Sequence, residues 1–141
     1  MHPNPIFRSE SDTRNIAFAR ERGFGVISIN GESGPLLSHI PFILNDDATC
    51  AYGHMVRSNP ILRSIEAPAS AVIAISGGDT YISPDWYGVP DQVPTWNYVA
   101  VHLRGTLERM PQDDLYDVLS ATSSRFESDR LPKAIWTMDK M

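Results

Sequence analysis

The sequence predicts a mainly β protein, an antiparallel barrel with short helices at its edges. Short apolar runs are joined by turns such as "GESG" and "NDDA", which is typical of antiparallel strands. Long helical segments do not regularly separate these runs, which disfavours a parallel βαβ architecture. The 141 residues are enough for one domain with its own core, and we expect a single domain over residues 1–141.

The first half of the chain predicts one helix and three strands. Ser9 or Ser11 can cap the start of the helix, and Gly23 is placed to end it. In the hairpin that follows, apolar residues alternate with others along the second strand, as one buried face requires. The expected elements are a helix at 9–23, hairpin strands at 24–30 and 35–44, and a third strand at 49–55.

The second half predicts two helices and at least two further strands. Asn59 or Ser58 can cap a short helix that has Pro60 at its first position. Residues 70–76 are apolar on both faces and indicate a central strand, which a turn at "GGD" would end. The expected elements are a helix at 59–67, a strand at 70–76, a turn at 77–79, a segment at 80–84, a long strand from Trp96, and a helix at 111–126. Residues 127–141 show no clear period.

The long strand in "VPTWNYVAVHLRG" has two unusual faces. Val99, Val101, Leu103 and Leu107 would fill one face, and Trp96, Tyr98, Ala100 and His102 would form the other. The second face is too aromatic to be simply solvated, and plain core is the usual explanation for such rings. On the outer face of a barrel strand, however, they would need a flat aromatic ligand or a second subunit to cover them.

The overall charge and the cysteine content narrow the possible partners. The formal charge is −5, with 17 acidic and 12 basic residues, which argues against unaided coating of nucleic acid. A DNA contact made through a dimer remains possible. Cys50 is the single cysteine, so an internal disulfide is excluded, and the apolar runs are too short for a membrane span. We expect a soluble cytoplasmic protein that does not enter a membrane.

The segment "GHMVRSNP" is the strongest local signal for binding. It ends a strand and begins a helix, where free backbone N–H groups and a partial positive charge favour an anion. Arg57 and His54 lie just before that helix, and Ser58 and Asn59 add further donors. The segment therefore predicts an anion site, with a phosphate as its guest. The alternative is a capped helix with an ordinary surface arginine.

The segment "SHIPFIL" is a second candidate. Pro41 cannot donate to a sheet ladder, so it indicates a sheet edge, a bulge, or a ligand on that side. His39 beside it is more often a structural histidine than a ligand. His39, His54 and His102 could also converge on zinc or iron, but their spacings match no compact metal motif. We expect no metal site.

The segments "GHMVRSNP", "YISPDWY" and "VPTWNYVAVHLRG" resemble the PaiB-like family of FMN-binding negative transcriptional regulators. The resemblance runs from Phe7 to about Met138 and includes "HIPFIL" and "FESDRLPKAIWTM". It implies the FMN-binding split-barrel fold shared with pyridoxamine-phosphate oxidase. That fold is a six-stranded antiparallel split β-barrel of Greek-key order with peripheral short helices. Family members generally continue beyond this length, so we expect the chain to lack their usual C-terminal segment.

The resemblance also implies a cofactor, a partner and a set of site residues. The cofactor would be FMN, held at the subunit interface of a homodimer. The flavin phosphate would lie at His54, Arg57, Ser58 and Asn59. The edge of the isoalloxazine ring would run along the backbone of His39, Ile40 and Pro41. The strand that completes the site would supply Trp96, Asn97 and Tyr98. Catalytic residues are not identified.

Three functions remain open from the sequence. The resemblance favours an FMN-binding negative transcriptional regulator. The first alternative is a flavin-dependent oxidoreductase that passes a hydride from NAD(P)H through FMN to a small acceptor. The second is a haem- or metal-binding barrel that uses His39, His54 and His102.

Overall fold

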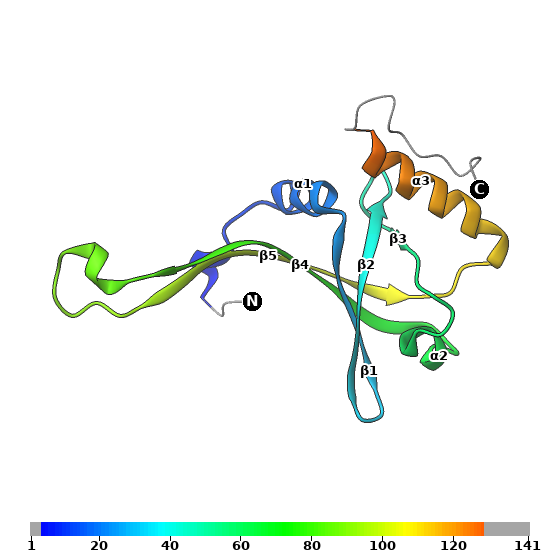
Figure 1. Cartoon of the computed structure of the whole chain (residues 1–141), viewed down its shortest axis with the longest axis horizontal. Helices are drawn as coiled ribbons and strands as arrows, with labels where there is room; N and C mark the ends of the chain where they lie inside the picture. Colours follow the sequence, from blue (N-terminus) through cyan, green and yellow to red (C-terminus); the bar gives the residue numbers. More distant parts are fainter. Residues whose placement is uncertain (1–3, 129–141) are drawn as a thin grey trace.

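The computed structural model describes residues 4–128, which form one five-stranded antiparallel sheet with short helices around it (Figure 1). The strands lie in the order β3-β2-β1-β4-β5, and each neighbouring pair is antiparallel. They are β1 (Phe24–Gly31), β2 (Gly34–Leu44), β3 (Ala51–Gly53), β4 (Ala69–Ile82) and β5 (Thr95–Leu107). The mainly β, antiparallel class is confirmed. The six-stranded closed barrel stays a prediction.

The helical segments are all short. They are η1 (Pro5–Arg8), α1 (Asp12–Arg22), α2 (Pro60–Ser64), η2 (Pro84–Tyr87), η3 (Gln112–Asp114) and α3 (Leu115–Glu127), where η marks a 3-10 helix. None of the helices within residues 4–128 is long and apolar enough to cross a membrane. Residues 129–141 lie outside the described residues. They include most of the segment at 127–141, for which no clear period was found, and most of "FESDRLPKAIWTM".

Helix α1 begins and ends where its capping residues predict. The Ser11 hydroxyl accepts a hydrogen bond from the Arg14 N–H (3.3 Å), and Gly23 ends the helix with φ of 53°. Gly23 is also closely approached, because a Cβ at this position would come within 2.7 Å of the Phe126 ring. Glycine therefore both ends α1 and makes room for α3.

The predicted hairpin of β1 and β2 is confirmed, with one face buried. In β1 the buried positions alternate, with Ile27 and Ile29 turned toward the core. In β2 the same face carries Ile40 and Phe42, which are 4% and 1% exposed. Residues of the opposite face, such as Leu37, are more exposed. The core side of the hairpin is the face that these four residues share.

The predicted turn at 77–79 is wrong. Residues 69–82 form the single strand β4, and its pairing with β5 shifts register between Ser76 and Asp79. Two consecutive glycines allow such a bulge, and a Cβ at Gly77 would come within 2.9 Å of the Val99 Cβ. The glycines bend a continuous strand instead of ending it. As expected for a strand apolar on both faces, β4 lies inside the sheet, between β1 and β5.

The hydrophobic core lies on one face of the sheet. Two groups of buried residues fill it, one packed under α2 and the other under α1. Their fully buried members are Ile27, Ile29, Ile40, Ile61 and Ile65 in the first group, and Ala19, Phe42 and Ile75 in the second. The opposite face has no member in either group. We call this opposite face the open face.

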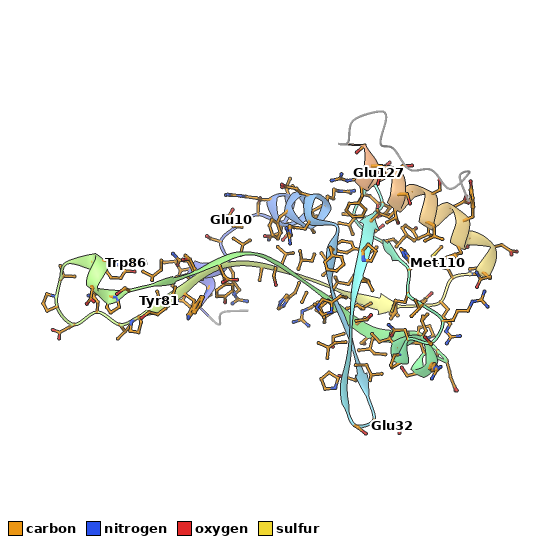
Figure 2. The ribbon with its side chains drawn as sticks, viewed as in Figure 1. Glu10, Glu32, Tyr81, Trp86, Met110 and Glu127 are labelled. Atoms are coloured by element: carbon orange, nitrogen blue, oxygen red, sulfur yellow. The ribbon has the colours of Figure 1, made fainter. Side chains whose placement is uncertain are left out.

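Beyond the bulge, β4 and β5 continue as a two-stranded hairpin that extends away from the rest of the molecule (Figure 1). We call residues 79–98 the arm. Figure 2 labels Tyr81 and Trp86 on this extension, with Met110 and Glu127 at the other end of the molecule. The arm carries part of the aromatic face that the sequence singled out.

Candidate functional site

Pro41 determines where β3 ends. The Phe42 N–H donates to the Gly23 carbonyl (2.8 Å), so even-numbered residues of β2 bond to β1 and odd-numbered residues face β3. The pairing of β3 with β2 stops at Gly53. The next bond on that side would need an N–H that Pro41 lacks, so the chain leaves the sheet at His54. Of the explanations for Pro41, the structure shows the sheet edge, and a ligand on that side stays a prediction.

The segment between β3 and α2, residues 54–59, is the junction where the sequence predicts an anion site. It is fixed by Asn59, whose Oδ1 accepts from the Ile61 N–H (2.9 Å) and whose Nδ2 donates to the Ser38 hydroxyl (2.9 Å). The first bond caps α2, as predicted, and the second ties the junction to β2. Helix α2 has only five residues, so its dipole is a minor contribution.

Arg57 and Ser58 lie on the surface of the junction. Both are exposed, and neither forms an ion pair or side-chain hydrogen bond with the residues that the structure describes. Arg57 therefore presents a cation without a carboxylate to neutralise it within residues 4–128. A guanidinium of this kind can make two parallel hydrogen bonds to a phosphate.

His54 is the residue of the junction whose bonding is incomplete. Its side chain is half-buried, and the buried Nδ1 atom has no hydrogen-bond partner among the described residues. A buried polar atom without a partner costs about 1–3 kcal/mol, so native proteins rarely leave one unsatisfied. The ring nitrogen is thus available to a group that binds at the junction. This feature fits the phosphate that the sequence predicts there.

The segment His39–Pro41 lies beside the junction on β2. By the same alternation that governs Pro41, the backbone N–H and C=O of His39 point away from β1 to the edge that β3 leaves uncovered. The His39 ring is exposed on the open face, 6.3 Å from the Phe24 ring. Ile40 is buried in the core, so this segment can offer a ligand its backbone but not the Ile40 side chain.

Trp96, Asn97 and Tyr98 lie on the arm, away from the junction. Strand β5 is one edge of the sheet and β3 is the other, so a single chain does not bring these residues to Arg57. Trp96 and Tyr98 are 58% and 56% exposed. The Trp96 ring meets Tyr81 edge to face, with ring centroids 5.8 Å apart. The predicted site residues therefore fall into two separate groups.

The three histidines of the metal alternative do not converge. His39 and His102 occupy one row across the sheet, but Val26 and Ala74 on β1 and β4 stand between them. Three strand spacings separate the two by about 14 Å. Within residues 4–128 no group of three histidine, cysteine, aspartate or glutamate side chains could hold a metal ion. His54 lies in the junction beyond the far edge of this row.

His102 also has a perturbed acidity. Burial lowers the pKa of its imidazole below the ordinary value of 6.5, and the positive charge of Arg104 lowers it further.

Ser38 is a residue of the candidate site that the sequence did not indicate. Its hydroxyl accepts the hydrogen bond from Asn59 that ties the junction to β2. This bond forms because β2 and the start of α2 lie next to each other in the fold. In the sequence, the one signal that could have indicated Ser38 is its position next to His39.

Comparisons with known proteins show which family the chain belongs to. The family described as "Putative FMN-binding domain" matches residues 1–141. The chain is 32% identical over 121 residues to "Protease synthase and sporulation protein PAI 2" of Bacillus subtilis. It is 30% identical over 106 residues to "Uncharacterized protein YKL070W" of Saccharomyces cerevisiae. These matches cover 84% and 69% of this chain.

The chain spans only part of the two relatives, since the matches cover 58% and 63% of their lengths. The resemblance to the PaiB-like family that the sequence motifs indicated is confirmed. Because the family model matches all 141 residues, the chain belongs to the family described as "Putative FMN-binding domain".

Proposed function

We propose that the junction binds the phosphate of FMN. The observation that carries the proposal is the unpaired, buried Nδ1 of His54 close in the chain to the unpaired Arg57. Arg57 would contribute the charge, and Ser58 and His54 would contribute hydrogen bonds to the phosphate oxygens. Asn59 would hold the junction in place, because its side-chain amide is already bonded to Ser38 and to α2.

The flavin ring would lie along the open edge of β2. The backbone of His39, Ile40 and Pro41 borders that edge, and the groups free to point at a ligand there are the N–H and C=O of His39 and the C=O of Pro41. FMN supplies the redox chemistry when it is bound. The residues of this chain would hold the phosphate, fix the orientation of the ring and limit its contact with water.

The assembly that completes the site would be a homodimer of split barrels, as the family resemblance implies. Support comes from the separation of the two groups of site residues, because Trp96, Asn97 and Tyr98 lie at the opposite edge of the sheet from β3. A second copy would bring those residues to the junction. A sixth strand and the closure of the barrel belong to the same proposal.

The biological role we propose is that of a regulator whose FMN-bound dimer controls gene expression. The relative PAI 2 supports it through its name, which refers to protease synthesis and sporulation. The charge of −5 disfavours unaided DNA binding, so any DNA contact would need the dimer to present its arginines together. Retention of operator DNA that weakens steeply with salt would support this role, and its absence at low salt would refute it.

The test of the FMN site is a titration of FMN into the Arg57→Ala variant, followed by flavin fluorescence. We expect FMN binding to weaken by about 1.5–3 kcal/mol, roughly 10- to 150-fold, because a charged hydrogen-bond partner is lost. Arg63→Ala is the matched control, since Arg63 is an exposed arginine at the far end of α2. If the titration of Arg57→Ala is unchanged, the phosphate of FMN does not bind at the junction.

A further inference from the structure

The open face of the sheet continues onto the arm along β5, past the bulge in β4. Ala74 pairs with His102, and Val72 pairs with Arg104, so these residues share the open face. The alternation along β5 then places Tyr98 and Trp96 on the same face. Within residues 4–128, neither α1 nor α2 covers it, because both pack on the core side. The strands that helix α3 contacts most are β2 and β3, at the edge of the sheet opposite β5.

The arm is rich in apolar side chains that the described chain leaves largely exposed. Seven large apolar residues of the arm are between 44% and 76% exposed: Tyr81, Trp86, Tyr87, Val89, Val93, Trp96 and Tyr98. Together they expose on the order of 700 Å². A standard protein interface buries about 800 Å² per partner, so this surface is of the right size for one. An isolated two-stranded hairpin is also only marginally stable in water.

The charges of the arm and of the open face are opposite in sign. The arm contains Asp79, Asp85 and Asp91 and no lysine, arginine or histidine. Before the bulge, the open face carries Arg104 and two histidines, and the alternating positions of β1, β2, β4 and β5 that form it there contain no carboxylate. Such complementarity steers two surfaces together and disfavours contact between surfaces of the same kind. The arm thus fits the open face better than it fits another arm.

We propose that the arm of each copy lies across the open face of a second copy, in a reciprocal exchange. The two contacts would be related by a twofold axis, as in most homodimers, because the same chain provides both surfaces. This inference deepens the proposed function and rests on its homodimer. It names the exchanged element, the arm, and the surface that receives it, which the FMN proposal leaves open.

The exchange would explain how the two groups of site residues meet. His39 lies on the open face, and its backbone borders the edge of β2 beside the junction. An arm that crosses the partner's open face would carry Trp96 and Tyr98 over the strand on which the partner's His39 lies. The aromatic rings would then be covered, and the FMN site would be complete only in the dimer.

The first experiment locates the arm by crosslinking. Benzoylphenylalanine replaces Trp86 in the full chain, and nitrogen-15-labelled and unlabelled copies are mixed before irradiation. We expect mixed-isotope crosslinks to peptides of the open face, from β1, β2 or the sheet part of β4 and β5. Crosslinks within one copy only, or to α1 and α2, would overturn the proposal.

The second experiment places a carboxylate on the open face. Leu37→Asp changes a side chain that is 62% exposed, so the fold should survive, and circular dichroism checks it. We expect the dimer dissociation constant to rise at least 30-fold, measured by light scattering across a dilution series. Met110→Asp is the matched control, because Met110 is 46% exposed and lies far from the arm (Figure 2). It should change the constant less than twofold.

The two proposals can fail separately. A monomer at high concentration, or a dimer that Leu37→Asp leaves intact, would overturn the exchange even if FMN still bound. Arg57→Ala should weaken FMN binding roughly 10- to 150-fold but leave the crosslinks of the arm unchanged. Loss of those crosslinks in Arg57→Ala would show that FMN, and not the open face, holds the arm.

Discussion

The body of the sheet and the arm are both rich in large apolar residues, but only the body buries them within the chain. Phe42, Ile61 and Ile75 of the body are completely enclosed, whereas Trp86 and Trp96 of the arm are 70% and 58% exposed. The difference lies in what each region packs against. The body has α1 and α2 on its core face, and the described arm has no segment of this chain beside its outer half.

This contrast separates two kinds of information in an apolar pattern. An alternating strand indicates that one face will be removed from water, whether by the same chain or by another molecule. In the body, helices α1 and α2 of the same chain cover the apolar face. On the arm, the apolar side chains must be covered by another molecule. Stability measurements can distinguish the two cases, because only intramolecular burial stabilises the monomer.

The largest expected difference is between truncations at Phe42 and at Trp96. Phe42→Ala should lower the free energy of unfolding by about 3–5 kcal/mol, because it removes a fully buried ring and leaves a cavity. Trp96→Ala should lower it by less than about 1 kcal/mol in dilute protein, where the chain is monomeric. Urea unfolding monitored by circular dichroism measures both.

If Phe42→Ala does not fold, Phe42→Leu provides the same comparison with a smaller loss, below about 1.5 kcal/mol. At concentrations that favour the dimer, Trp96→Ala should become more damaging, whereas the effect of the Phe42 variants should stay constant. Equal losses for Phe42 and Trp96 in dilute protein would show that the arm is held by its own chain.

A pair of glycines provides a comparison of intermediate size. Gly23 and Gly88 both have positive φ, 53° and 65°, so alanine strains the backbone at either position. At Gly23 a Cβ would also meet the Phe126 ring, whereas at Gly88 on the arm nothing lies within 4 Å. We expect losses of about 2–3 kcal/mol for Gly23→Ala and about 1 kcal/mol or less for Gly88→Ala.

Thermal unfolding of the two alanine variants side by side checks this expectation. A combined variant, Gly23→Ala with Phe126→Ala, should recover part of the loss, because the contact between the two side chains is removed. Without any such recovery, backbone strain alone would account for the Gly23 effect, and the close packing of α1 against α3 would contribute little.

Most of the body could be predicted from the sequence because its signals are local. Ser11 and Gly23 define α1 through hydrogen bonds within a few residues, and the alternation in β2 identifies Ile40 and Phe42 as core. The double glycine was misread for an equally physical reason. Gly77 and Gly78 permit a turn or a bulge, and only the pairing of β4 with β5 decides between them.

The candidate site was less predictable because it depends on register. The early end of β3 follows from Pro41 facing β3 and not β1, which is fixed by the pairing of β2 with β1. The Ser38–Asn59 hydrogen bond joins residues that are 21 positions apart. The sequence indicated the chemistry at Arg57 and His54, but not that Trp96 would lie at the opposite edge of the sheet.

The smallest expected effect is a pH dependence that arises at His102 on the open face. Burial and the charge of Arg104 lower its pKa below 6.5, so the folded chain binds this proton less tightly than the unfolded chain does. The free energy of unfolding should therefore fall as the pH is lowered through 6.5 toward the folded pKa. His102→Gln should remove this part of the pH dependence, measured as urea midpoints on both sides of that range.

The same measurement sharpens the contrast between body and arm when it is repeated at high protein concentration. If an arm covers the open face in the dimer, the loss of water at His102 lowers its pKa further, whereas the carboxylates that the arm brings to this face raise it. The difference between the native chain and His102→Gln should then change with protein concentration at acidic pH, in the direction set by the stronger of the two effects. A difference that is the same at low and high concentration would mean that the dimer leaves His102 as it is in the monomer. The surface covered by the second copy would then have to lie elsewhere.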